Sequence, residues 1–147
     1  MSVKFYRPKE QFGCFSNFSR HGIELDGKYW PTTEHYFQAQ KFAGTEFEEK
    51  VRLTQTPREV ANMGRDRSLP LRKDWEQVKD SIMTRAVLKK VQTHDIVKKA
   101  LLSTSHDEII EDSPIDYYWG CGANGTGKNM LGKILVEIRN TIRTVER

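Results

Sequence analysis

The pattern of hydrophobic and polar positions predicts helices over most of the chain. Two long segments carry an apolar residue every three or four positions, which places these side chains on one face of a helix. After Asp74 the apolar residues are Trp75, Val78, Ile82, Ala86 and Val87. After Asn129 they are Leu131, Ile134, Leu135, Ile138, Ile142 and Val145. Each segment is expected to be a helix with one buried face.

Four shorter helices are predicted, three of them from capping signals. Thr32 or Thr33 follows Pro31 and can cap a helix that begins near Thr33. Two later segments match the capping box, in which a threonine is followed three positions later by a glutamate. The remaining helices are expected at about 46–54, 57–63 and 95–102.

Strand signals are short and few. The segment Ile23–Trp30 alternates around Asp26-Gly27, which is a strong hairpin signal. Val3–Tyr6 suits a short strand, and 108–111 a short extended piece. The fold class expected is therefore mainly α: a single-domain helical bundle of about six helices with a small N-terminal β-hairpin element, over residues 1–147.

Composition indicates an ordinary globular protein. Hydrophobic residues make up 37% and charged residues 30% of the chain, and the mean hydropathy is -0.69. The first ten residues lack the apolar segment of a signal peptide, and no apolar run approaches the roughly 18 residues of a membrane span. We expect a cytoplasmic protein that does not bind a membrane.

The cysteines and the net charge give only limited information about binding partners. Cys14 and Cys121 lie far apart with no metal-ligand spacing, so we expect two free thiols and neither a zinc site nor a disulfide framework. No cofactor is expected either. The net charge is +4. Nucleic acid and phosphorylated small molecules would both suit this charge and the basic group Arg65, Arg67, Arg72 and Lys73. Nothing in the sequence sets an oligomeric state.

The richest stretch is Trp30–Lys41, which reads WPTTEHYFQAQK. Glu34, Gln38 and Lys41 stand at i, i+4 and i+7, and so form one stripe of the expected helix. The stripe is either a solvated face with weak pairs of roughly 0.2 to 0.5 kcal/mol each, or the floor of a pocket. Helical spacing alone favours the solvated face.

Two loops carry further candidates. In Gly13–Ser19, Phe15 and Phe18 flank Ser16 and Asn17, as in a packed loop or the wall of a base-binding pocket, and the packed loop is favoured. The long loop Ser113–Lys128 bears Asp116 and Trp119, and long loops are usually functional.

The end of this second loop, GANGTGKN, nearly matches a nucleotide-binding P-loop. Asn129 lacks the hydroxyl that binds Mg²⁺ and no buried strand precedes the loop, so a nucleoside triphosphatase is rejected. The glycines and Lys128 could still hold a phosphate or another anion at the helix start.

Five blocks in order resemble the YbiA-like family, also called NADAR. They are GCFSNF, WPTTEHYFQAQK, ANMGRDRSLPLRKDWEQVK, DYYWGCG and GKNMLGKIL, and the resemblance spans about Phe5 to Ile142. Members are small, mainly helical N-glycosidases. They cleave a base from ribose in phosphoribosylamino-pyrimidine intermediates of riboflavin synthesis, or ADP-ribose from guanine.

The resemblance implies a set of functional positions. It makes Glu34, Gln38 and Lys41 site residues rather than a surface stripe. The other positions implied are Asn17, Arg65, Asp116, Trp119, Asn129 and Gly132. One departure is Val91, where the family usually has phenylalanine, and this affects local packing rather than activity.

N-glycoside hydrolysis explains these residue types. The reaction passes through an oxocarbenium-like sugar, so a carboxylate, Glu34 or Asp116, must offset positive charge or orient water. Lys41 is expected to act as a positive donor beside Glu34, and a covalent imine through its amine is the alternative. No metal is needed.

The remaining candidates would bind the substrate. Trp119 and Phe15 would stack on the base, and Arg65 and Lys128 would hold phosphate.

The function expected is hydrolysis of reactive phosphoribosylamino-pyrimidines, which yields free base and ribose 5-phosphate. A rival enzyme function is removal of ADP-ribose from guanine in nucleic acid. A third alternative is a non-catalytic ADP-ribose-binding module, which would need the aromatic and basic residues but not Glu34 together with Lys41.

Overall fold

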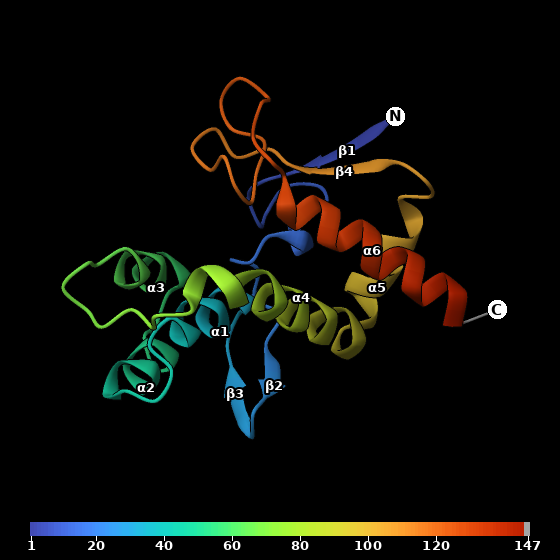
Figure 1. Cartoon of the computed structure of the whole chain (residues 1–147). Coiled ribbons are helices and arrows are strands. Elements are labelled where there is room, and N and C mark those ends of the chain that lie inside the picture. The colour runs from blue at the N-terminus through green and yellow to red at the C-terminus, as the bar shows by residue number, and fades with distance from the viewer. Residues whose placement is uncertain (146–147) are drawn as a thin grey trace. The chain divides into compact units, whose positions relative to one another are not determined.

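The computed structural model describes residues 1–145 in two compact units (Figure 1). Unit 1 consists of Met1–Ser16 and the chain from His94 onward, and unit 2 consists of Asn17–Thr93. The six predicted helices are all present, so the mainly α fold class is confirmed. The prediction of one domain over 1–147 stays a prediction.

Unit 2 begins with a hairpin and continues as four helices. The strands are β2 (Ile23–Leu25) and β3 (Lys28–Trp30), and the helices are α1 (Thr33–Gln40), α2 (Glu46–Arg52), α3 (Pro57–Gly64) and α4 (Trp75–Thr93). The strands pair antiparallel, with Ile23 opposite Trp30. Asp26 and Gly27 have φ values of 57° and 76°, which the tight turn requires and which Asp-Gly sequences favour.

The helix starts of unit 2 follow the capping residues. The side chains of Thr32, Thr45 and Thr56 each accept a hydrogen bond from a first-turn amide of α1, α2 and α3. The helix ends are less regular, because α1 stops at Gln40 and leaves Lys41 in the C-cap position. Local chemistry thus sets where these helices begin.

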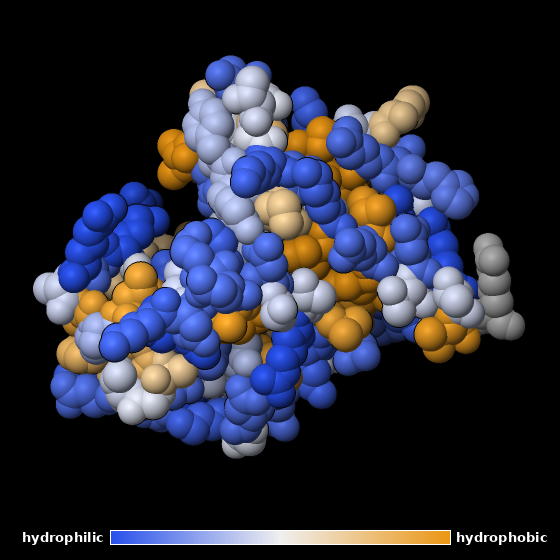
Figure 2. Space-filling view, in the orientation of Figure 1, coloured by the Kyte–Doolittle hydropathy of each residue, from blue (hydrophilic) through white to orange (hydrophobic). Residues whose placement is uncertain are grey.

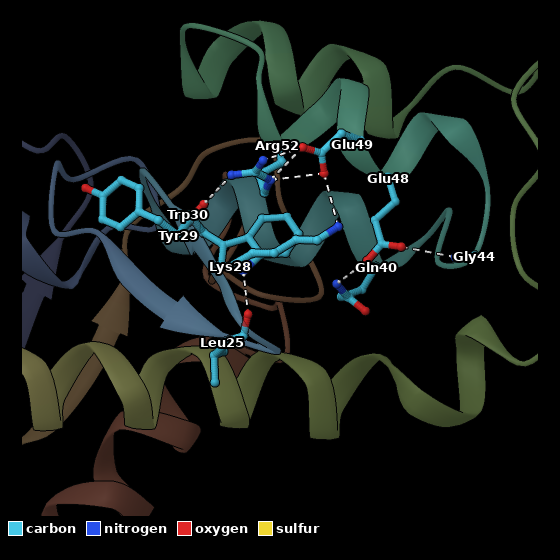
Figure 3. Close-up of polar contacts among 9 residues, drawn as sticks. All are labelled: Leu25, Lys28, Tyr29, Trp30, Gln40, Gly44, Glu48, Glu49 and Arg52. Carbon is cyan, nitrogen blue, oxygen red and sulfur yellow. Dashed lines mark hydrogen bonds and ion pairs between the residues drawn. The ribbon is translucent and has the colours of Figure 1, made fainter.

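Buried aromatic residues join the hairpin of unit 2 to α1. Trp30 has no exposed surface, and its ring meets Tyr36 edge-on at a centroid distance of 5.1 Å. The indole N–H of Trp30 donates to the carbonyl of Leu25 at 3.0 Å (Figure 3). The hydroxyl of Tyr36 donates to Asp26 at 2.9 Å. The hairpin therefore fixes the position of α1 through both apolar and polar contacts.

Unit 1 combines a parallel strand pair with two helices. Its elements are β1 (Ser2–Phe5), a 3-10 turn (Gly13–Phe15), α5 (Asp95–Ser103), β4 (Glu108–Glu111) and α6 (Met130–Val145). The strands β1 and β4 pair in parallel, with Val3 opposite Ile109. A side chain at Gly132 would collide with the carbonyl of Ile109, so glycine allows α6 to approach β4 closely.

No helix within the described part of the chain is long and apolar enough to cross a membrane. In Figure 2, hydrophobic residues gather at the surface near α6 within a rim of hydrophilic ones. In unit 1, residues 106–109 and α6 side chains that include Val136 and Arg139 line an open groove of about 500 Å³.

Candidate active site

The polar stripe of α1 is buried rather than solvated. All eight residues of α1 are buried, and Glu34 and Gln38 are each only 7% exposed. The interpretation of the stripe as a solvated face is therefore wrong. A buried carboxylate loses hydration and must be held by donors or nearby positive charge, so the surroundings of Glu34 decide its chemistry.

Contacts with Asn17 and Gln38 help to hold Glu34 in place. Its backbone amide, one of the orphan donors of the first helical turn, donates to the carbonyl of Asn17 at 3.1 Å. Its carboxylate oxygen Oε2 accepts a hydrogen bond of 2.9 Å from Nε2 of Gln38, one turn further along α1. The orientation of the carboxylate is thus set by a neighbour on the same helix.

Asn17 ties its loop to the start of α1. Its side-chain oxygen accepts a 2.8 Å hydrogen bond from the hydroxyl of Thr33. Its side-chain nitrogen lies 3.4 Å from the sulfur of Met83 on α4. Asn17 was predicted to bind substrate, which stays a prediction. In the structure, Asn17 also positions Thr33, the residue next to Glu34.

Lys41 lies where α1 and α3 meet. Its ammonium nitrogen donates to the carbonyl of Gly64 at 3.1 Å. The same nitrogen lies 5.9 Å from the ring centroid of Phe37 and 5.6 Å from that of Trp75, within the range of cation–π contacts. Trp75 was predicted to be a core residue, and it is indeed buried. Its ring also forms part of the surroundings of Lys41.

Burial lowers the pKa of Lys41 below its ordinary value. Glu34 opposes this shift, and the positive charges of Arg65 and Lys79 add to it. The sequence led us to expect that Glu34 would prevail and keep the lysine charged. In the structure desolvation has the larger effect on this pKa, so the shift is toward the neutral amine, and the role of Lys41 stays a prediction.

The basic loop after α3 is exposed. Arg65 directly follows Gly64, and its guanidinium donates to the side-chain oxygen of Asn62 at 2.5 Å. Arg72 is paired with Asp74, so its charge is partly offset. Of the two, Arg65 is the better placed to meet a ligand from solvent.

The predicted residues of unit 1 lie in the loop before α6. Asp116 accepts hydrogen bonds from the backbone amides of Tyr118 at 3.0 Å and of Trp119 at 2.7 Å. The rings of Tyr118 and Trp119 meet edge-on at 4.8 Å. Asp116 therefore organises the turn that presents Trp119. Its catalytic role and the stacking role of Trp119 stay predictions.

The start of α6 does not form a phosphate cradle. The backbone amides of Lys128, Asn129, Met130 and Leu131 all donate to carbonyls of residues 117–120. The expectation that the glycines and this helix start hold an anion is therefore corrected, because the amides that would bind the anion are occupied. The side chain of Lys128 is exposed, with its nitrogen 5.5 Å from the ring centroid of Tyr118. Phosphate binding by that side chain stays a prediction.

Asn129 and Phe15 have structural surroundings in unit 1. The side-chain oxygen of Asn129 accepts a hydrogen bond from the backbone amide of Glu111 at 2.9 Å. Its side-chain nitrogen donates to the carbonyl of Ile109 at 2.8 Å. Phe15 is 2% exposed and packs on Phe5 and Phe12, so the packed-loop alternative is observed. We leave Phe15 out of the proposed site, and substrate binding by Asn129 stays a prediction.

Comparison with known proteins places the chain in a family. The NADAR domain matches residues 4–143. The chain belongs to the NADAR family. Over 99% of its length it is 47% identical to N-glycosidase Npun_R5314 of Nostoc punctiforme and covers 95% of that protein. It is also 45% identical to N-glycosidase YbiA of Escherichia coli, over 95% of this chain and 88% of that protein.

A solved structure and a plant relative extend the comparison within the NADAR family. The NMR structure of E. coli YbiA matches with a TM-score of 0.91 and 43% identity, over 99% of this chain and 86% of that one. The chloroplastic riboflavin biosynthesis protein PYRR of maize is 39% identical over 95% of this chain, which spans 25% of PYRR. The similarity to YbiA confirms the predicted fold and family.

The sequence did not identify one residue of the candidate site. It marked Gly64 only as the end of a helix, yet the carbonyl of Gly64 binds Lys41. The one signal available was the position of Gly64 directly before Arg65 in the family block. In the residues that the structure describes, no three His, Cys, Asp or Glu side chains are arranged to hold a metal ion.

Proposed function

We propose that this NADAR protein hydrolyses the N-glycosidic bond of phosphoribosylamino-pyrimidine intermediates of riboflavin biosynthesis. The names of its near relatives support N-glycosidase activity, and the name of the maize relative supports this substrate class. The observation that carries the proposal is the buried Glu34 carboxylate, which Gln38 orients on the same helix that delivers Lys41.

Glu34 supplies the negative charge that the reaction needs. As the bond between the anomeric carbon and the base nitrogen breaks, positive charge develops on the sugar ring. A buried carboxylate stabilises that charge more strongly than one in water, because the surrounding dielectric is lower. Glu34 also accepts the proton of the water that completes hydrolysis.

Lys41 acts as the nucleophile in this proposal. Its neutral amine attacks the anomeric carbon, and the base leaves with the bonding electron pair and gains a proton. The sugar ring opens to an imine on Lys41, and water then adds to the imine carbon and releases ribose 5-phosphate and the free amine. The lowered pKa of Lys41 supports this route over the fixed positive donor, since only the neutral amine can attack.

Arg65 is the residue of unit 2 that we assign to the phosphate. Its guanidinium is exposed at the end of α3, and its planar fork can bind two phosphate oxygens at once. Because Arg65 also lowers the pKa of Lys41, its charge acts on the amine. A phosphate bound to Arg65 would offset part of its positive charge and so reduce its effect on the pKa of Lys41.

The substrate class is tested by incubating the purified protein with a phosphoribosylamino-pyrimidine and, separately, with DNA carrying ADP-ribose on guanine. Chromatography follows the release of free base or of ADP-ribose. We expect release from the phosphoribosylamino-pyrimidine. Release from the modified DNA alone would replace our proposal with the rival enzyme function. Binding without release from either substrate would favour the non-catalytic module.

A further inference from the structure

Gly64 lies against two residues of the proposed site, Lys41 and Gln38. Its carbonyl accepts the hydrogen bond from Lys41 at 3.1 Å. Its α-carbon faces the side-chain amide of Gln38, and a Cβ added there would come well inside the 3.0 Å that real Cβ atoms essentially never cross. The amide that orients Glu34 therefore occupies the space that any other residue at position 64 would fill.

We propose that Gly64 is a positioning residue, whose missing side chain lets the Gln38 amide lie where it aims the Glu34 carboxylate. The inference rests on the proposed function, since it assigns Gly64 a role in that same site. Gly64 itself need not contact the substrate. It acts through Gln38 on one side and through its own carbonyl on Lys41.

Backbone conformation does not explain a glycine at this position. Gly64 is the last residue of α3 and is helical, so an alanine would fit the backbone. Gly44 differs, because its φ of 83° is a conformation that side chains rarely adopt, and a Cβ there would meet nothing within 4 Å. At Gly64 the requirement is space beside Gln38, and at Gly44 it is backbone geometry.

The Gln38 amide cannot move aside without losing its contact to Glu34. Gln38 is 7% exposed, and its Nε2 is bonded to the carboxylate. Its Oε1 is buried and has no hydrogen-bond partner in the described chain. The orientation of the amide is therefore set by Glu34 and by the open space at Gly64, not by a partner of its own.

The first test compares Gly64→Ala with Gly44→Ala, which add the same methyl group at two places in unit 2. We expect Gly64→Ala to lower kcat by about 10- to 100-fold, because a displacement near 1 Å at a reacting group has effects of that size. KM should change by less than about threefold. Gly44→Ala should lower the thermal midpoint but leave kcat unchanged. Full activity of a folded Gly64→Ala protein would overturn the proposal.

A double-mutant cycle asks whether Gly64 acts through Gln38. Gln38→Ala removes the amide and leaves room for a methyl group at position 64. Residues that act through one another show non-additive effects. We therefore expect the Gly64→Ala/Gln38→Ala protein to be no slower than Gln38→Ala alone. An additional loss equal to that of the single Gly64→Ala change would contradict positioning through Gln38.

A readout without substrate separates this inference from the proposed function. The side-chain NH₂ signals of Gln38 in a ¹⁵N NMR spectrum report its hydrogen bond to Glu34. They should shift clearly in Gly64→Ala and stay in place in Gly44→Ala. If the wild type hydrolyses no phosphoribosylamino-pyrimidine, the function is wrong but this shift still tests the geometry. Unchanged Gln38 signals in Gly64→Ala would overturn the positioning role.

Discussion

His35 and the pair Glu34–Gln38 are neighbours on α1 and are all buried. They differ in how completely their polar atoms are hydrogen-bonded. Nδ1 of His35 lies 2.8 Å from the hydroxyl of Thr32, and its Nε2 lies 2.8 Å from the carbonyl of Thr54. Both ring nitrogens thus have a partner. In the other group, Gln38 keeps a buried oxygen with no hydrogen-bond partner among residues 1–145.

The difference separates a structural network from the one that we propose to be catalytic. A buried polar group that is completely hydrogen-bonded stabilises one arrangement of the chain. A buried amide whose oxygen has no hydrogen-bond partner reduces stability, and such sites are retained where chemistry needs them. His35 should therefore matter for stability and little for turnover, and Glu34 should show the reverse.

The largest difference between the effect on rate and the effect on stability is expected for Glu34→Gln. The change removes the charge but keeps the shape and an oxygen that can accept from Gln38. The rate should fall by roughly 10²- to 10⁴-fold, as for loss of an essential acid–base group. The thermal midpoint should not fall, because a neutral amide is easier to bury than a carboxylate.

Base release and thermal unfolding together measure this effect. Glu46→Gln, the same change in the exposed first turn of α2, is the matched control and should retain full activity. A Glu34→Gln protein that hydrolyses substrate at the normal rate would reduce Glu34 to a residue of the helix start.

Lys41 should be the next most sensitive position. Lys41→Met removes the nucleophile, and we expect a loss of at least about 100-fold. Borohydride added during turnover should reduce the imine and leave a sugar fragment on Lys41, which mass spectrometry of the peptide detects. Absence of trapping while product forms, together with an inactive Lys41→Met protein, would show that the lysine works as a positive donor instead.

His35→Ala should affect stability rather than rate. It leaves a cavity and removes the ring from the hydroxyl of Thr32 and the carbonyl of Thr54, at an expected loss of roughly 2 to 4 kcal/mol in the free energy of unfolding. Urea unfolding measures this loss. The kcat of the folded protein at low temperature should change by less than about threefold. His106→Ala, at an exposed position, should change stability by about 0.5 kcal/mol or less.

The same histidine should make stability depend on pH. Burial lowers the pKa of His35, so the folded state favours the neutral ring while the unfolded state binds a proton near pH 6.5. Stability is therefore complete above about pH 6.5 and falls as the pH decreases from there toward the lower folded-state pKa. The slope is at most about 1.4 kcal/mol per pH unit for this one group. Urea unfolding of wild type and His35→Gln between pH 7.5 and 5.5 should differ in that slope, and equal slopes would contradict this assignment.

The smallest effect is expected outside both groups, on the surface between β3 and α2. Figure 3 shows Lys28 and Arg52 both reaching Glu49, and the ammonium of Lys28 lies 3.1 Å from that carboxylate. Arg52 is the largest cause that lowers the pKa of Glu49 to about 2, and it remains when Lys28 is replaced. Lys28→Ala should therefore shift the thermal midpoint by less than about 2 °C at low salt, and by less at high salt. A larger shift would mean that this exposed pair contributes as much as a buried one.

Local signals allowed the sequence to predict much of the fold. Threonine caps marked the starts of three helices, and Asp26-Gly27 marked the hairpin, because these residues act on backbone atoms only a few positions away. The parallel pairing of β1 with β4 was not predicted. It joins segments about a hundred residues apart, and the chemistry of one short strand does not specify its partner.

The candidate site also has features that the sequence predicted and features that only the structure revealed. Helical spacing and the family resemblance identified Glu34, Gln38 and Lys41, because residues four apart on a helix are neighbours whatever surrounds them. The burial of Glu34 and Gln38, the lowered pKa of Lys41 and the space at Gly64 came only from the tertiary structure. Exposure and desolvation depend on which distant segments pack against a helix. A stripe of polar residues therefore has the same sequence pattern whether water or protein covers it.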